Sequence, residues 1–321
     1  MTSKIIKFII EKIVRPKKSE KILFITDTIK KDLALPFFDY CVQAGQTTDL
    51  VIMLPTEADG QEPSSIVSLA CQDADIIMVL TKWSITHTKS LQVAKKKGAK
   101  VITFPAVTED ILERCVPVDY KKIEKLTKIL AGLISSKEKI AITTKVGTNL
   151  LISTKGFKAR PMYGLARKGF HMNLPDGETS VGVSDANGVL VVDGSMPPDQ
   201  TSKWGKIGLV KEPIKLTIKD CFVQKIEGEK EAKILSKILK FYGKSAYKIA
   251  ELGIGANPKA KVSGNVTEDE KVLGTIHIAL GNDTGLGGSN YAPIHLDGVI
   301  LAPTLWINEK KIIEHGILKT R

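Results

Sequence analysis

The chain has 321 residues, of which 43% are hydrophobic and 26% charged, a length that accommodates two domains or one large one. Its formal net charge is +12, but only five of the 47 basic residues are Arg, and 6% of the residues are aromatic. Specific recognition of phosphates and bases favours Arg and aromatic side chains, so we expect no specific nucleic-acid partner. No apolar run reaches the ~20 residues that a membrane span requires, and no secretory signal is evident.

The first part of the chain alternates predicted helices and strands. Residues 1–18 are predicted to form an amphipathic helix that packs on the body of the protein or on a partner subunit. Strands are predicted at 21–27, 48–54, 75–80 and 99–104, and helices at 29–44, 66–74, 90–97 and after Thr108, a predicted N-cap. This alternation indicates a mainly parallel sheet, so we predict an N-terminal α/β layer domain at residues 1–135. No GxGxxG motif follows the first strand, and we therefore predict no dinucleotide site.

The second part is predicted to be β-rich. A helix at 120–136 leads into short runs that Gly, Pro, Asn and Asp interrupt. Strands are predicted at 140–144, 150–154, 189–192, 214–219 and 221–228, a helix at 230–241, and a closing hairpin at 304–313. We predict an α+β metal-binding catalytic domain at residues 136–321, so the fold class is α/β with a second, β-rich α+β domain.

Four cysteines are scattered through the chain without metal-ligand spacing. We interpret them as reduced, buried residues of a cytoplasmic protein.

Two of the five histidines lie 18 positions apart in short apolar runs near the end of the chain, at 274–280 and 293–301. Because residues i and i+2 of a strand point to one face, His295 and Asp297 should project side by side. A buried imidazole and a buried carboxylate are costly unless they are paired or bind metal. Two histidines and one carboxylate on adjacent strands therefore indicate a metal site, although a hydrogen-bonded core pair would give the same pattern.

Several stretches, in order along the chain, resemble the thermophilic metalloaminopeptidase family, the aminopeptidase T and aminopeptidase S type. They are Ser84–Thr88, Gly98–Lys100, Pro105–Asp110, Val146–Leu150, Asn173–Glu178, Glu251–Gly253, Asp269–Lys271, Gly274–Gly281 and His295–Asp297. Taken singly, Glu178 and Glu251 would be ordinary turn or capping residues.

The resemblance implies a cytoplasmic, dimeric aminopeptidase that hydrolyses the N-terminal peptide bond of a peptide substrate. It also implies two divalent metal ions (Zn, Co, Mn or Mg) that activate a shared water. The residues that match the family's ligands are Glu178, Glu251, His277, His295 and Asp297, with Glu251 in the bridging, catalytic position. Glu270 matches an acidic position without an expected ligand role, and His87 lies in a family motif without an assigned role.

The chain departs from the peptidase pattern at Thr284, where the family has a Tyr near the reaction centre. The Thr hydroxyl is shorter and far less acidic than a phenol, and the nearby Tyr291 is a candidate to take the catalytic place of the family Tyr, although the sequence does not show that it does. Two other functions stay open. The same superfamily contains a mononuclear Fe(II) dioxygenase that opens the ring of dihydroxypyridine, and the chain could also be a non-catalytic metal-binding member.

Overall fold

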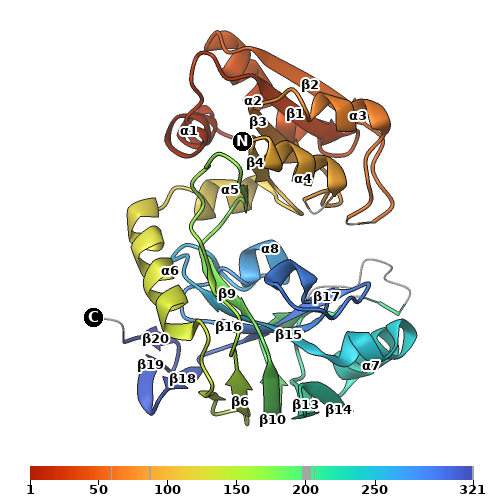
Figure 1. Cartoon of the computed structure of the whole chain (residues 1–321), viewed down its shortest axis with the longest axis vertical. Coiled ribbons are helices and arrows are strands. Elements are labelled where there is room, and N and C mark those ends of the chain that lie inside the picture. The colour runs from red at the N-terminus through yellow and green to blue at the C-terminus, as the bar shows by residue number, and fades with distance from the viewer. Residues whose placement is uncertain (59, 87, 197–203, 206, 320–321) are drawn as a thin grey trace. The chain divides into compact units, whose positions relative to one another are not determined.

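The computed structural model describes residues 1–319 except 59, 87, 197–203 and 206 (Figure 1). His87 therefore lies outside the described residues. The chain forms two compact units: residues 1–120 with 164–176, and residues 121–163 with 177–321. The domain boundary expected near residue 135 stays a prediction.

The first unit contains a parallel five-stranded sheet. Its strands follow the order β2 (Thr48–Met53), β1 (Ile22–Asp27), β3 (Ile76–Leu80), β4 (Lys100–Thr103) and β8 (His171–Asn173). Strand β8 was missed because its three residues carry no apolar run.

Helices cover both faces of this sheet. They are α2 (Lys31–Gln43), α3 (Ser65–Ala70), α4 (Lys89–Lys96) and α5 (Glu109–Cys115). Leu23 and Ile25 of β1 belong to the hydrophobic cluster that includes Val67 of α3 and Leu91 of α4. Phe24, between them, points the other way and meets a ring of α2 edge-on. This alternation explains why β1 is apolar at consecutive positions, as strands buried on both faces are.

The N-terminal segment forms α1 (Ser3–Phe8) and a π-helical continuation, η1 (Ile9–Val14). Ile9, Ile13 and Val14 are fully buried, so this segment packs its apolar side within the first unit. At the predicted N-cap of α5, the Thr108 hydroxyl accepts a hydrogen bond from the Ile111 amide.

The second unit contains two antiparallel sheets. The larger has the order β14 (Phe222–Glu227), β13 (Ile214–Lys219), β10 (Asp185–Val192), β6 (Asn149–Ser153), β5 (Ile140–Thr143), β18 (Thr304–Ile307), β19 (Lys310–Glu314) and β20 (Ile317–Leu318). The smaller has the order β17 (His295–Ile300), β16 (Ile276–Gly281), β15 (Ile249–Gly255), β9 (Glu178–Gly182) and β7 (Arg160–Met162). A short ribbon pairs β11 (Ser195–Met196) with β12 (Gly208–Leu209), and a short helix, α8, spans Val266–Asp269.

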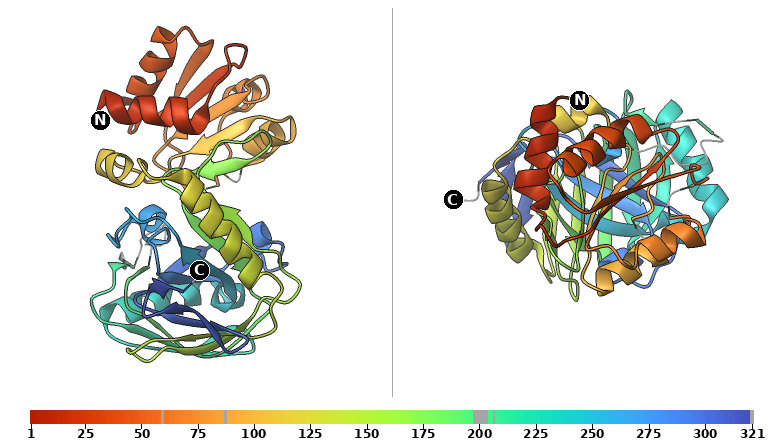
Figure 2. Two further views of the ribbon diagram at one scale, coloured as in Figure 1. Left: turned by 90° about the vertical axis from the view of Figure 1, so that its left-hand side faces the viewer. Right: turned by 90° about the horizontal axis from the view of Figure 1, so that it is seen from above.

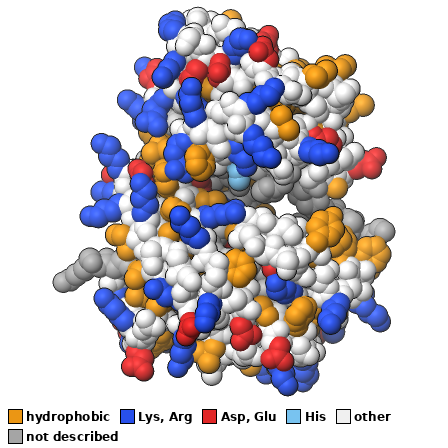
Figure 3. All heavy atoms as spheres, in the orientation of Figure 1, with side chains coloured by type: hydrophobic (Ala, Val, Ile, Leu, Met, Phe, Trp, Pro, Cys, Tyr) orange, Lys and Arg blue, Asp and Glu red, His pale blue; other side chains and the backbone are white. Residues whose placement is uncertain are grey.

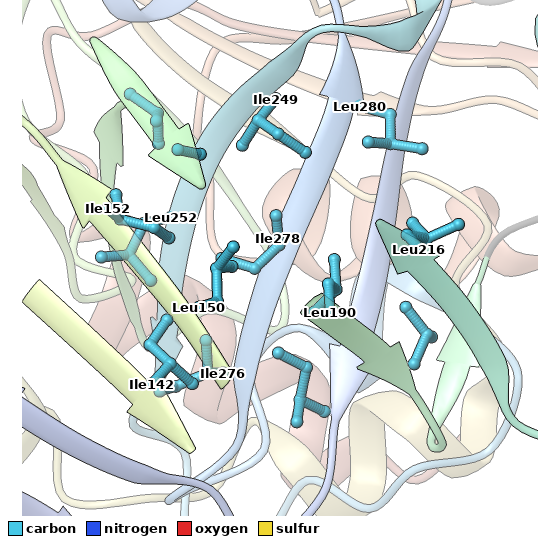
Figure 4. Close-up of a cluster of buried hydrophobic side chains, with 14 of the residues drawn as sticks. Ile142, Leu150, Ile152, Leu190, Leu216, Ile249, Leu252, Ile276, Ile278 and Leu280 are labelled. Atoms are coloured by element: carbon cyan, nitrogen blue, oxygen red, sulfur yellow. The ribbon is translucent and has the colours of Figure 1, made fainter. Parts of the chain in front are cut away.

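The hydrophobic core of this unit lies between the two sheets. Figure 4 shows Leu252, Ile276, Ile278 and Leu280 of the smaller sheet among core residues of the larger. Helices α6 (Tyr120–Ile134) and α7 (Lys230–Tyr242) add side chains to the same cluster, and Figures 1 and 2 show α6 beside the sheets. Every second residue of β16 packs in this core, as do Ile249, Leu252 and Ile254 of β15, where an irregularity follows Ile249. The residues between them point to the opposite face.

This architecture confirms the predicted fold class, a parallel α/β layer combined with β-rich α+β structure. None of the helices in the described ranges is both long enough and apolar enough to span a membrane. Lys and Arg side chains are scattered over the face of the molecule in Figure 3, interspersed with Asp and Glu.

Candidate metal centre

The predicted ligand residues lie on the face of the smaller sheet that points away from the core. Gly253 of β15 pairs with His277 of β16, and Ala279 of β16 lies between Glu251 and Asp297 on its two neighbouring strands. The small residues leave space for the longer polar side chains. A methyl group added to Gly253 would lie only 1.9 Å from His277 Nε2, so the imidazole covers the glycine directly.

The structure brings all five predicted ligand residues into one cluster. His277 Nε2 lies 3.6 Å from Glu178 Oε2 and 3.8 Å from Glu251 Oε1. His295 Nε2 lies 3.1 Å from Glu251 Oε2 and 3.5 Å from Asp297 Oδ1. Glu251 therefore lies between the two imidazoles.

The chemistry of these atoms fits a bound cation. Among the described residues, Glu178 Oε2, both ring nitrogens of His277 and Asp297 Oδ1 are buried without a hydrogen-bond partner. Buried polar atoms in that condition are costly, and a metal ion held among them would remove the cost.

His295 is oriented as a metal ligand should be. Its Nδ1 lies 2.8 Å from the Asn282 carbonyl oxygen, which can only accept, so Nδ1 carries the hydrogen and donates it. Nε2 then points at Glu251 and Asp297, and once it loses its proton it offers a lone pair to a metal ion there. An imidazole that donates its second nitrogen to a backbone carbonyl is the usual arrangement around protein-bound metals.

The electrostatics of the metal-free cluster follow from burial and from the mixture of charges. Burial lowers the pKa of His277, but the carboxylates of Glu251 and Glu178 outweigh burial and raise that pKa to about 9. Burial opposes ionisation of Glu251, yet the two imidazoles hold its pKa well below the usual range. Burial dominates at Glu178 and raises its pKa to about 8. Protons on the imidazoles therefore compete with a metal ion for the same lone pairs.

Sequence reasoning missed one member of the cluster, Lys271, which is completely buried. Its Nζ lies 2.9 Å from Glu178 Oε1 and also donates to Glu270 Oε1. Glu270 is thus part of the cluster through the lysine. The family resemblance includes Asp269–Lys271 but gives Lys271 no role, and a Lys in a charged stretch normally indicates a solvated surface.

Three predicted positions need separate comment. Taken singly, Glu251 was interpreted as a turn or capping residue, whereas it lies inside β15, which runs from Ile249 to Gly255. Thr284 and Tyr291 lie in the loop between β16 and β17. The Thr284 hydroxyl donates to Asn282 Oδ1 at 2.8 Å, and Tyr291 is 75% exposed. The structure does not bring these two residues into the cluster of described ligand candidates, and a catalytic role for either stays a prediction.

Comparison with known proteins gives a consistent result. The family model of 2,5-dihydroxypyridine 5,6-dioxygenase matches residues 37–320. A relative named 2,5-dihydroxypyridine 5,6-dioxygenase, from Pseudomonas putida strain KT2440, is 23% identical over 273 residues, which are 77% of this chain and 71% of the relative. The solved structure of a 2,5-dihydroxypyridine dioxygenase from P. putida KT2440 superposes with a TM-score of 0.83 and 17% identity, covering 99% of this chain and 96% of the other.

A second solved structure, wild-type AmpT from Thermus thermophilus, superposes with a TM-score of 0.71 and 12% identity, covering 99% of this chain and 98% of the other. At these identities, both structures show the fold alone.

The predicted aminopeptidase function is wrong, and so is the predicted hydrolase class. Both the matching family model and the relative carry the name of a dioxygenase. The error has a physical source. Several of the motifs that suggested a peptidase lie on the strands that build the ligand-bearing sheet face, and AmpT has the same fold. Such motifs identify the scaffold and leave the reaction open. The match over residues 37–320 shows that this chain belongs to the 2,5-dihydroxypyridine 5,6-dioxygenase family.

Proposed function

We propose that this chain is an Fe(II)-dependent dioxygenase that opens the ring of a dihydroxylated nitrogen heterocycle such as 2,5-dihydroxypyridine. The observation that carries the proposal is the convergence of two imidazoles with the Asp297 carboxylate, because Asp297 Oδ1 and both ring nitrogens of His277 are buried without a hydrogen-bond partner among the described residues. Membership of the dioxygenase family supports this reading of the cluster.

His277, His295 and Asp297 would hold one Fe(II). Two histidines and one carboxylate are the ligand set of non-haem Fe(II) oxygenases, which leaves positions open for other ligands. When bound, the iron supplies the one-electron chemistry through which O₂ reacts with an electron-rich ring. All three residues come from β16 and β17, adjacent strands whose other face is fixed in the core.

Glu251 would orient the substrate. Its carboxylate is held between the two imidazoles and remains ionised, so it can accept a hydrogen bond from a ring hydroxyl. Glu251→Gln should therefore raise KM for the heterocycle by a larger factor than that by which it lowers the metal content per chain.

The reaction balances without an added reductant. Cleavage of the bond between C5 and C6 places one oxygen atom of O₂ on each carbon, and the ring itself supplies the electrons. The decisive experiment loads the purified chain with Fe(II) without oxygen, then adds 2,5-dihydroxypyridine and O₂. We expect loss of the ring absorbance, one O₂ consumed per ring, and both atoms of ¹⁸O₂ in the product.

Two variants control the experiment. His295→Ala should abolish Fe(II) binding and turnover. His315→Asn should change neither, since His315 is an exposed turn residue with a positive φ of 48° that Asn tolerates. If the iron-loaded chain consumed no O₂ with 2,5-dihydroxypyridine or its ring isomers, the proposed function would be wrong.

Two further parts of the proposal concern the molecule as a whole. Exposed apolar residues of the first unit, Leu54, Ile66 and Leu69, support a homodimer, which light scattering would detect and Ile66→Glu with Leu69→Glu should disrupt. A cytoplasmic location is supported by the four cysteines, which lie in the described part of the chain, are all buried and form no disulfide.

A further inference from the structure

The cluster contains a cation of its own. Lys271 has no exposed surface, and its Nζ contacts the carboxylates of Glu178 and Glu270. Its backbone is fixed on both sides, because its amide donates to the Glu268 carbonyl at 2.9 Å and its carbonyl accepts from the Asn257 amide at 2.8 Å. The ammonium therefore has a set position within the cluster.

The candidate ligands form two groups. In each group the ligand atoms are close enough to one another to hold an ion. One comprises Glu178, Glu270 and His277, and the other comprises Glu251, His295 and Asp297. Lys271 donates to both carboxylates of the first group, whereas both ring nitrogens of His277 lack a hydrogen-bond partner among the described residues, so His277 remains available to the single metal of the proposed function.

We propose that the Lys271 ammonium takes the place of a second metal ion, so that this chain binds one divalent cation where an all-carboxylate cluster would bind two. The inference rests on the proposed function for the identity of the single metal. Lys271 Nζ binds Oε1 of Glu178 and Oε1 of Glu270, so an ion held at the second oxygen of either group would share that carboxylate with the ammonium. A divalent ion bound there at about 2.0–2.2 Å would be a like charge close to the ammonium, in a buried site where water does not screen the repulsion.

The neighbouring carboxylates do not relieve this conflict. Asp269 Oδ1 and Oδ2 accept hydrogen bonds from the Ser263 and Gly264 amides, at 2.6 and 2.9 Å. Glu268 Oε1 accepts from the Lys261 amide at 2.7 Å. Those two carboxylates fix the preceding loop, which leaves Glu178 and Glu270 as the carboxylates that neutralise Lys271.

The test counts bound metal and does not depend on turnover. Wild type, Lys271→Gln and a control, Lys219→Gln, are dialysed to equilibrium against Mn(II) and against Zn(II), and metal per chain is measured by elemental analysis. Lys219 is an exposed residue of β13. We expect one ion per chain in the wild type and the control, and two in Lys271→Gln. Two ions in the wild type, or one in folded Lys271→Gln, would overturn the inference.

A second pair of variants keeps the question answerable if Lys271→Gln fails to fold. Lys271→Arg retains the charge and should hold one ion. Glu178→Gln should also hold one ion, with an affinity within about threefold of the wild type, because Glu178 serves the lysine and is no ligand of the single metal. Loss of the ion from Glu178→Gln would refute the inference. Absence of ring cleavage together with the expected metal counts would reject the proposed function alone.

Discussion

The Gly253→Ala substitution tests the geometry of the metal centre with a single methyl group. Gly253 is inside β15 and has no positive φ, so alanine is compatible with its backbone. The added carbon would lie 1.9 Å from His277 Nε2 and 2.1 Å from Cε1, whereas ordinary contact begins at 3.4 Å. The ring must therefore move by about 1.5 Å, the difference between these distances. Displacing a ligand through the residue that supports it typically costs 10–100-fold in metal affinity.

At the upper end of that range, the loss is about 2.7 kcal/mol. At a metal concentration of 100 times the wild-type Kd, metal stabilises the wild type by about 2.7 kcal/mol, and the variant by only about 0.4 kcal/mol. Calorimetric titration with Mn(II) and thermal unfolding with and without metal measure both quantities. Gly285→Ala is the matched control, because a methyl group there meets nothing within 4 Å. Wild-type metal affinity in Gly253→Ala would show that His277 is not a ligand.

Four further outcomes follow from the structure. Gly132→Ala should raise the free energy of unfolding by about 1 kcal/mol, measured by urea titration, because Gly132 is an exposed position inside α6 with open space around it. Asp283→Ala should lower it by about 3 kcal/mol in the same titration, since Asp283 is fully buried and pairs with Lys248. The pKa of His277 is raised to about 9, and the protonated imidazole cannot bind metal. As the pH is lowered below 9, metal affinity should therefore fall about tenfold per pH unit for each imidazole proton that the metal displaces, which titrations at pH 7 and 8 would measure. Ellman's reagent should react slowly with the native chain and stoichiometrically in denaturant, because burial raises the pKa of three thiols to about 11 or 12: Cys41, Cys71 and Cys221.

Strand periodicity was enough to predict the part of the site that lies within one element. The spacing of His295 and Asp297 requires that they share a face if the segment is a strand, and β17 is that strand. The parallel sheet of the first unit could also be predicted, because its strands are continuous apolar runs between helices. Only the resemblance to a known family added Glu178 and Glu251, since each alone resembles an ordinary turn or cap residue.

Lys271 could not be found in this way. Its burial depends on two carboxylates: Glu178, which comes from another segment at the start of β9, and Glu270, which directly precedes it. The sequence contains 47 basic residues, and the short motif that includes Lys271 gives no sign that this one is buried. The reaction was missed for a related reason. The charge of the cluster is set by all of its residues, and the motifs contain only some of them.

The smaller sheet explains how one scaffold can serve different metal chemistries. One face of β15 and β16 is fixed by the core, where Leu252, Ile276 and Ile278 are fully buried. The other face needs small residues such as Gly253 so that imidazoles and carboxylates can converge, whichever reaction they serve. Motifs built from these residues therefore describe the sheet face and do not specify the reaction. The choice between one metal and two is made by a few side chains that project onto the face from outside the sheet, and in this chain the side chain with the matching charge and position is Lys271.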